Sequence, residues 1–159
     1  MPYLSIEYIL LLIGHYDRDP GLDPYLMVLL HQGEHMNQWI CTSSHVNGQQ
    51  RGDQNQRGGL IPPVHHCNNL PRYIVNLKPE DSSKVKGVEG NFYRINPNVV
   101  TTKSGTERSY FGIHLDANVP GSLGCPVMDR RNFNDFEETM ANIFQPGQVE
   151  KIPFFPYYS

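Results

Sequence analysis

The sequence predicts a β-rich α+β fold that forms a single domain over residues 1–159. Thirteen prolines and fourteen glycines in a chain of this length favour many short elements joined by turns. Short apolar runs bounded by turn residues recur along the chain, as expected for strands. Only residues 129–144 show the period of a long amphipathic helix. Together these patterns favour a sheet with one main C-terminal helix over a helical bundle.

The chain begins with an apolar stretch at residues 3–13, with the letters YLSIEYILLLI. It is too short for a membrane span, lacks a basic leading region and carries Glu7, so we expect a buried strand or short helix and no secretory signal. Residues 15–24 are rich in Asp, Pro and Gly, which indicates a solvated turn more than a calcium loop. We therefore treat residues 1–24 as an N-terminal extension.

A β-hairpin is predicted over residues 25–44, where the strands YLMVLL and MNQWICTSS flank the turn HQGEH. Residues 45–59 are rich in Gly, Gln and Asn without a hydrophobic period, which predicts a surface loop. Residues 78–90 are polar and predict a second loop. Further strands are predicted at residues 71–77, 92–95 and 109–114.

The helix at residues 129–144 is predicted from apolar side chains at spacings of three and four, which form one face. These side chains are Phe133, Phe136, Met140 and Ile143. Pro146-Gly147 ends the helix. The tail KIPFFPYYS reads as an edge strand, because its prolines lack the N–H that a central strand needs.

Composition excludes several function classes. A net charge of −3 and a pI near 6.1 leave no basic face for nucleic acid. An odd number of cysteines, without a CxxC spacing, does not suggest a disulfide framework. We expect one reactive thiol among Cys41, Cys67 and Cys125, with the other two structural.

Residues 113–128, between a predicted strand and the predicted helix, contain several residue types that are common in active sites. A cysteine needs a base or a positive dipole to become a thiolate at neutral pH. His114 lies eleven residues before Cys125, far enough for a loop to fold back, and the helix that starts near Asp129 adds a positive end. Gly121 and Gly124 allow a tight bend that points amides at a developing oxyanion. These residues predict a nucleophilic Cys–His pair.

The commoner alternative for each residue is structural. A lone cysteine after a glycine is more often a small buried hydrophobe, and a histidine at a strand end is more often a core or surface residue. His65-His66-Cys67 looks like a metal site, but adjacent histidines on a strand point opposite ways, so we expect no metal and no cofactor. Arg94 and Arg108 fit a clamp for a substrate carboxylate, although solvated arginines are commoner.

The same stretch resembles the signature of the L,D-transpeptidase catalytic domain, which has a YkuD-like fold. Ile113-His114 is similar to the family's early histidine, and Ser122-Leu123-Gly124-Cys125 is similar to its Ser-His-Gly-Cys block. Weaker likenesses upstream extend the resemblance over roughly residues 25–155, but only the His-to-Cys block is specific. The resemblance implies a mixed β-sandwich or barrel. Leu123 stands where the family has a second histidine.

The resemblance also implies a mechanism. Cys125 would attack a carbonyl at an L-centre of a peptidoglycan stem peptide, with the backbone N–H groups of Gly124 and Cys125 holding the oxyanion. His114 would move the proton, and Asp116 or a backbone carbonyl would orient its ring. An amine would then resolve the thioester to a cross-link, or water would hydrolyse it. The residues expected to contact substrate are Ser122, Asn118, Arg94 and Arg108.

This leaves two classes of function. The first is a cysteine-dependent enzyme on peptidoglycan stem peptides, at the bacterial cell wall or periplasm. The lack of a clear signal peptide favours delivery by phage lysis or by effector secretion. The second is a non-catalytic module that keeps the fold and binds peptidoglycan, for which Leu123 is the main support. Neither a membrane span nor a nucleic-acid partner is expected, and the sequence leaves the oligomeric state open.

Overall fold

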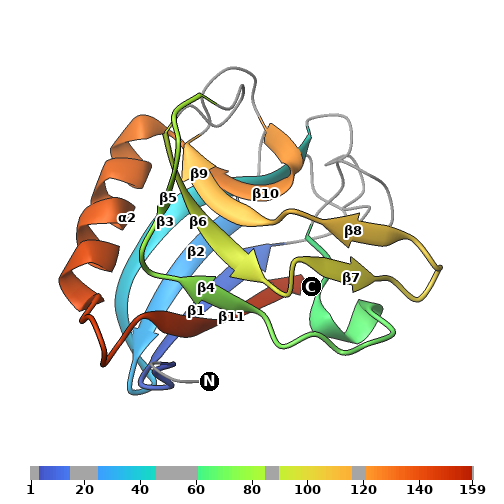
Figure 1. The fold of residues 1–159 in the computed structure, drawn as a ribbon, viewed down its shortest axis with the longest axis horizontal. Coiled ribbons are helices and arrows are strands. Elements are labelled where there is room, and N and C mark those ends of the chain that lie inside the picture. The colour runs from blue at the N-terminus through green and yellow to red at the C-terminus, as the bar shows by residue number, and fades with distance from the viewer. Residues whose placement is uncertain (1–3, 15–24, 46–60, 85–89, 116–120, 159) are drawn as a thin grey trace.

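One strongly curled mixed sheet forms the frame of the protein (Figure 1). The computed structural model describes residues 4–14, 25–45, 61–84, 90–115 and 121–158. Hydrogen-bonded strands follow the order β4-β11-β1-β2-β3-β10-β9-β6-β5. They are β1 (Tyr8–Gly14), β2 (Tyr25–His31), β3 (Glu34–His45), β4 (Ile74–Asn76), β5 (Glu80–Ser82), β6 (Gly90–Asn96), β9 (Gly112–Leu115), β10 (Gly121–Met128) and β11 (Lys151–Tyr158).

Two smaller pieces accompany the sheet. A separate hairpin pairs β7 (Val99–Thr101) with β8 (Glu107–Ser109) and projects to one side in Figure 1. A single turn of 3-10 helix, η1, covers Val64–His66. Within the large sheet, β4 also pairs with β6 over two residue pairs, so the sheet curls until strands near its two ends meet. The β-rich α+β class is confirmed, with a mixed sheet and one main helix.

The core lies between the inner face of the curled sheet and helix α2 (Arg130–Ile143). The four apolar helix residues that predict its buried face are all buried. Trp39 of β3 packs edge-on against Phe136, with ring centroids 5.1 Å apart. The Asp129 side chain caps the helix by accepting from the Asn132 amide at 2.8 Å. The predicted helix is therefore confirmed, and its N-terminal amides have their own carboxylate cap.

The predicted hairpin is confirmed as β2 and β3, joined at Gln32-Gly33, where both residues have positive φ. The segment that we treat as an N-terminal extension contributes β1, which pairs with β2 on one side and β11 on the other. Its apolar run thus forms an interior strand. The predicted loop at residues 78–90 contains the short strand β5. Nearly all of the predicted loop at residues 45–59 lies outside the described residues.

The prediction of an edge strand at the C-terminus is wrong, because β11 pairs with β4 and with β1. Pro153 and Pro156 fit inside the sheet because β4 and β1 pair with different parts of β11. The Phe154 amide donates to the Tyr73 carbonyl on the β4 side. Successive strand nitrogens face opposite ways, so the nitrogen of Pro156 also faces the β4 side, beyond the residues that β4 pairs. The nitrogen of Pro153 faces β1, whose ladder with β11 starts only at Phe154.

The outer side of β11, β1, β2 and β3 carries apolar side chains in register, and we name it the apolar face. Its members are Ile9, Leu11, Ile13, Leu26, Val28, Leu30, Ile40, Phe155 and Tyr157. None of them is charged, and Ile40 and Tyr157 are 52% and 62% exposed. A strand that is apolar on both sides is typical of a strand buried on both sides. Here the inner side fills the core while the outer side reaches the surface.

Candidate active site

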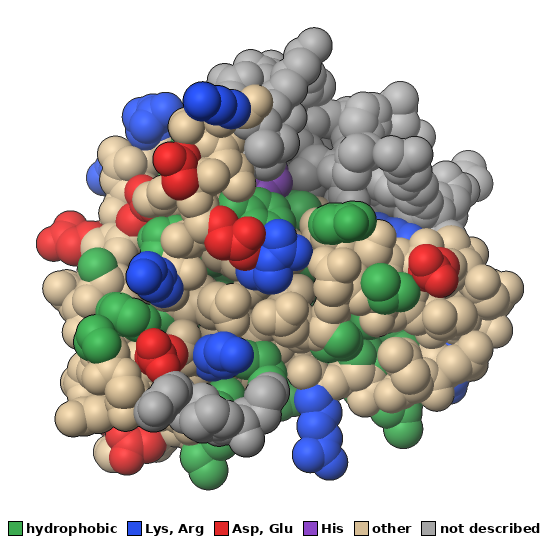
Figure 2. All heavy atoms as spheres, in the orientation of Figure 1, with side chains coloured by type: hydrophobic (Ala, Val, Ile, Leu, Met, Phe, Trp, Pro, Cys, Tyr) green, Lys and Arg blue, Asp and Glu red, His purple; other side chains and the backbone are tan. Residues whose placement is uncertain are grey.

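Strands β6, β9 and β10 bring together a second set of outward-facing residues, which we name the Cys125 face. It consists of Phe92 and Arg94 on β6, Gly112 and His114 on β9, and Cys125 and Val127 on β10. Their neighbours Tyr93, Ile113 and Met128 point into the main core, so alternation places this set on the opposite side. Figure 2 shows this side, where a histidine lies beside apolar side chains.

Register arranges the Cys125 face in two rows across the three strands. Antiparallel pairing of β6 with β9 sets Arg94 beside Gly112, and hence Phe92 beside His114. Parallel pairing of β9 with β10 sets His114 beside Val127, and hence Gly112 beside Cys125. Cys125 and His114 are therefore diagonal neighbours on one face, about 7–8 Å apart at their Cα atoms by ordinary sheet geometry. The predicted pair is brought together by strand pairing, not by a loop.

The His114 ring is held in one tautomer. Its Nδ1 lies 2.9 Å from the Leu115 carbonyl oxygen. A carbonyl oxygen only accepts, so Nδ1 carries the hydrogen and Nε2 keeps the lone pair of a neutral imidazole. Burial lowers the pKa of His114 below its ordinary value of 6.5, although the bond to Leu115 works in the opposite direction. His114 is thus a neutral base at neutral pH, oriented by a backbone carbonyl.

The Cys125 thiol is 8% exposed and lies between two backbone groups with opposite effects. Its Sγ donates to the Tyr110 carbonyl at 3.4 Å, which favours the protonated thiol. A hydrogen bond with the Gly112 backbone lowers the pKa, as do the positive charges of Arg108 and Arg94. Burial outweighs these contributions and raises the pKa of Cys125 to about 11. The resting pair is therefore thiol and neutral imidazole, not an ion pair.

Tyr110 breaks the strand that the sequence predicts at residues 109–114. The chain leaves β8 at Ser109, passes Tyr110 with a φ of 61°, and re-enters the sheet as β9 at Gly112. A positive φ is unusual for a bulky residue, and such positions cluster at functional sites. The Tyr110 amide donates to the Asn98 carbonyl at 3.1 Å, which helps to hold this conformation. The bend turns the Tyr110 carbonyl towards Cys125.

Phe92 covers the centre of the Cys125 face. Its ring stacks on the His114 ring with centroids 5.8 Å apart and 26° between planes. It also forms an apolar cluster with Cys125 and Val127. The tip of the ring occupies the space above Gly112, since a Cβ placed on Gly112 would lie 2.1 Å from Phe92 Cζ. One aromatic ring thus contacts both members of the Cys–His pair.

The two arginines expected to bind substrate have different surroundings. Arg94 makes a bidentate ion pair with Glu80, with Nε–Oε2 at 2.6 Å and Nη2–Oε1 at 3.1 Å. This pair holds the pKa of the Glu80 carboxyl below its ordinary value. Arg108 is buried beneath the surface, with its guanidinium carbon 5.5 Å from the centroid of the Phe111 ring. The alternative of a solvated arginine is wrong for Arg108, whose charge instead acts on the Cys125 thiol from within the protein.

The remaining predicted residues lie around β10. Cys125 belongs to this strand, and not to a strand-to-helix loop. Gly124 and Ser122 lie where the pairing of β10 with β3 shifts, between Gly121 and Pro126. Such irregularities free backbone groups from the ladder and recur beside active sites. Asp116 and Asn118 lie outside the described residues.

Sequence reasoning missed Phe92, Gly112 and the Tyr110 carbonyl. A signal existed for Phe92, because alternation along the predicted strand at residues 92–95 places it on the same side as Arg94. No local signal connects it with Cys125, which is distant in sequence. The expectation that helix α2 assists the thiol is also corrected. Asp129 caps the helix N-terminus, and the charges that lower the pKa of Cys125 belong to Arg108 and Arg94.

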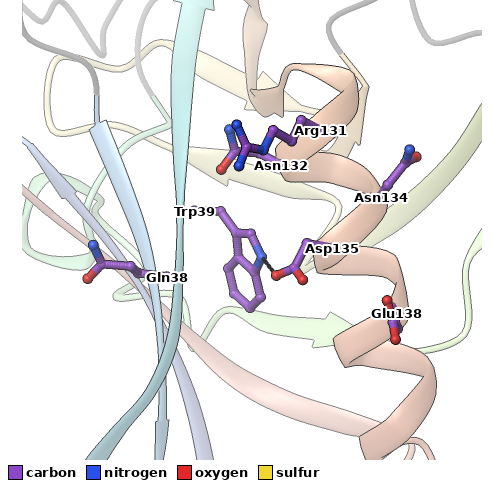
Figure 3. Close-up of a pocket in the computed structure, with 7 residues that line it drawn as sticks. All are labelled: Gln38, Trp39, Arg131, Asn132, Asn134, Asp135 and Glu138. Atoms are coloured by element: carbon purple, nitrogen blue, oxygen red, sulfur yellow. Dashed lines mark hydrogen bonds between the residues drawn. The ribbon is translucent and has the colours of Figure 1, made fainter.

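A groove of about 460 Å³ lies elsewhere, between β3 and α2 (Figure 3). Trp39 points from β3 towards the helix, and its Nε1 donates to Asp135 Oδ2 at 2.7 Å. Asn37 donates to the same oxygen at 3.0 Å, and the Ile40 amide donates to Asn132 Oδ1 at 3.1 Å. The residues that line this groove include none from the Cys125 face. Its contacts fasten α2 to the sheet, so we interpret it as structural.

No protein-family model matches the chain, and no curated protein matches it. Among the described residues, no group of three or more His, Cys, Asp or Glu side chains is placed to hold a metal ion. Within the same ranges, no helix is both long enough and apolar enough to cross a membrane. A proposal for function therefore depends on the Cys125 face and on the resemblance of residues 113–125.

Proposed function

We propose that this protein is a cysteine-dependent acyl-transfer enzyme that acts on the stem peptides of bacterial peptidoglycan. The observation that carries the proposal is the placement of Cys125 and His114 as diagonal neighbours on one face of β9 and β10. The His114 tautomer, which leaves Nε2 as the base, supports it. The choice of peptidoglycan comes from the likeness of Ile113-His114 and Ser122–Cys125 to the L,D-transpeptidase signature.

The reaction follows from the protonation states. His114 Nε2 takes the thiol proton as Sγ attacks the peptide carbonyl, so the thiolate forms only during attack. The backbone N–H groups of Gly124 and Cys125 stabilise the tetrahedral oxyanion. The imidazolium then protonates the leaving amine, which departs and leaves a thioester on Cys125. Water or an acceptor amine attacks the thioester with His114 again as base, and the thiol returns.

The two acceptors define two products at the cell wall. Transfer to water removes a terminal residue or cleaves a cross-link, whereas transfer to an amine forms a cross-link. In this proposal the protein reaches the wall through phage lysis or effector secretion, and the hydrolytic outcome fits such a wall-degrading role. The Arg94–Glu80 pair lies at the margin of the site. Within the described residues, Arg94 uses three of its five N–H groups on Glu80 and Asn98, and in this proposal the other two bind a substrate carboxylate.

The test is mass spectrometry of purified muropeptides after incubation with the wild-type protein and with Cys125→Ala. The expected result is loss of a terminal residue, cleavage of dimers or formation of new dimers by the wild type alone. A trapped adduct with the mass of an acyl fragment on Cys125 would identify the thioester. Unchanged muropeptides at high enzyme concentration, with the protein folded by circular dichroism, would contradict the proposal.

A second candidate is a non-catalytic module that binds peptidoglycan peptides through the same face. The specific observation in its favour is the Cys125 thiol itself, which is buried, donates to a carbonyl and has a pKa raised to about 11. Leu123 in place of a histidine points the same way. This candidate predicts that Cys125→Ala binds muropeptides as tightly as the wild type, measured by calorimetry, while neither protein alters them.

A further inference from the structure

Gly112 is the only member of the Cys125 face without a side chain, and it lies at the centre of one row. Arg94 flanks it on β6 and Cys125 flanks it on β10. With strands about 4.8 Å apart, the missing side chain leaves a notch about 9–10 Å long from the arginine strand to the thiol strand. A glycine inside a strand often marks a place where a ligand or another backbone approaches closely.

The Phe92 ring fills this notch in the structure. Its tip lies where a Gly112 side chain would be, and the same ring contacts the His114 ring. The Arg94 guanidinium carbon lies 5.4 Å from the ring centroid on another side. Phe92, His114 and Cys125 are all less than a tenth exposed, and the ring lies against both reactive side chains. The ring therefore lies across Gly112, between the strand of Arg94 and the strand of Cys125.

We propose that Phe92 is a gate, and that the notch above Gly112 is the subsite for the substrate main chain next to the scissile bond. When the ring swings away from Gly112, an extended peptide with a small side chain at this position crosses from β6 to β10 and presents its carbonyl to Cys125. Among the described residues, the ring is held by stacking on His114, by apolar contacts and by the Arg94 guanidinium, with no backbone hydrogen bond involved, so a side-chain rotation opens the site without moving a strand. This inference deepens the proposed function and names the residues that select its substrate.

The first test measures the gate without any substrate. Iodoacetamide labelling of Cys125 is followed by peptide mass spectrometry at mildly alkaline pH, in the wild type, Phe92→Ala and Phe92→Leu. Cys41 and Cys67 serve as internal controls, because both are buried away from Phe92. We expect Cys125 labelling to rise at least about tenfold in Phe92→Ala, and less in Phe92→Leu, while the other two cysteines keep their rates.

Two results would overturn the gate. One is an unchanged Cys125 rate in a folded Phe92→Ala variant. The other is an equal rise at all three cysteines, because that pattern reports general loosening of the fold. This labelling experiment does not require turnover, so it tests the gate separately from the proposed activity on peptidoglycan.

The second test separates the notch from the gate. In Gly112→Ala the new methyl group would collide with the Phe92 ring, so the double variant Gly112→Ala/Phe92→Ala removes that collision. We expect the double variant to label at Cys125 as fast as Phe92→Ala, but to lose at least about tenfold in peptide turnover relative to it. Equal turnover of the two variants would show that substrate does not cross Gly112. If neither the variants nor the wild type turn over muropeptides, the affinity for the same muropeptides is measured by calorimetry instead. Equal affinities of the two variants would then show that the peptide does not cross Gly112.

Discussion

The two outer faces of the sheet differ in what they carry, although one continuous core supports both. The nine members of the apolar face, on β11, β1, β2 and β3, include no charged side chain, although Lys151 of β11 lies on the same outer side by alternation. Several of the members are largely exposed. The Cys125 face, on β6, β9 and β10, has a thiol, an imidazole and a guanidinium within two rows. Its thiol and imidazole are less than a tenth exposed, and both contact the Phe92 ring.

The exposure of a titratable side chain determines how far the protein can shift its pKa. A fully solvated group that is far from other charges keeps its ordinary pKa, whereas a covered one is shifted by burial and by the few groups that it touches. Cys125 and His114 are shifted in opposite directions, which keeps both neutral and makes the thiol dependent on its base. Tyr157 is the one titratable member of the apolar face and is 62% exposed, so exposure there changes surface properties without creating a reactive site.

The largest expected difference between the faces is in turnover. We predict that Cys125→Ala removes detectable muropeptide turnover, a loss of at least about 10³-fold, because the nucleophile is gone. Tyr157→Ser, on the apolar face, should retain turnover within about twofold. The comparison uses initial rates from chromatography of defined muropeptides. Equal losses in both variants would indicate that the reaction is not confined to the Cys125 face.

The next effect concerns the base. His114→Gln should reduce kcat/KM by about 10²–10⁴-fold, the usual worth of general-base assistance. Protonation of His114 removes the base, and burial lowers its pKa, so the acid limb of the wild-type pH profile should have its midpoint below 6.5. The limb should disappear in the variant. A profile whose acid limb is unchanged in His114→Gln would exclude this residue as the base.

Alkaline stability should also distinguish the faces. The folded-state pKa of Cys125 is about 11, against an ordinary 9.0, so between these values the unfolded chain releases a proton that the folded chain retains. Stability therefore falls as pH rises through this window, by up to about 2–3 kcal/mol for a shift of this size. Cys125→Ala should flatten part of the fall, while the other groups whose pKa burial raises, which are Cys41, Cys67, Tyr73 and Tyr93, maintain the rest. Urea unfolding across this pH range provides the measurement, with Ile40→Ala as the control that leaves the slope unchanged.

A smaller effect compares one aliphatic residue from each face. Val127 is 1% exposed and Ile40 is 52% exposed. Val127→Ala should lower the free energy of unfolding by about 2 kcal/mol, because two buried methyl groups are lost and the space is only partly refilled. Ile40→Ala should cost less than about 1 kcal/mol. Similar costs in urea unfolding at neutral pH would mean that the apolar face is covered in solution.

Elements whose signals are local could be predicted from the sequence without any structure. The spacing of Phe133, Phe136, Met140 and Ile143 is enough for the helix, and the turn at Gln32-Gly33 is enough for the hairpin of β2 and β3. The order of residues from His114 to Cys125 is also enough to nominate the reactive pair. These features depend on residues close in sequence, so neighbours along the chain carry the information.

The pairing of distant strands, and with it the site, is settled only in the folded sheet. Placing β11 inside the sheet depends on partners at both of its sides, which no local pattern in KIPFFPYYS reveals. The approach of Phe92 to Gly112 depends on the register between β6 and β9. The contact of Cys125 with the Tyr110 carbonyl depends on the positive φ of Tyr110. An aromatic residue in a predicted strand gives no sign of such a backbone conformation. A single-residue shift in any of these registers would turn the side chains to the other face, so the reactive arrangement exists only once the whole sheet is formed.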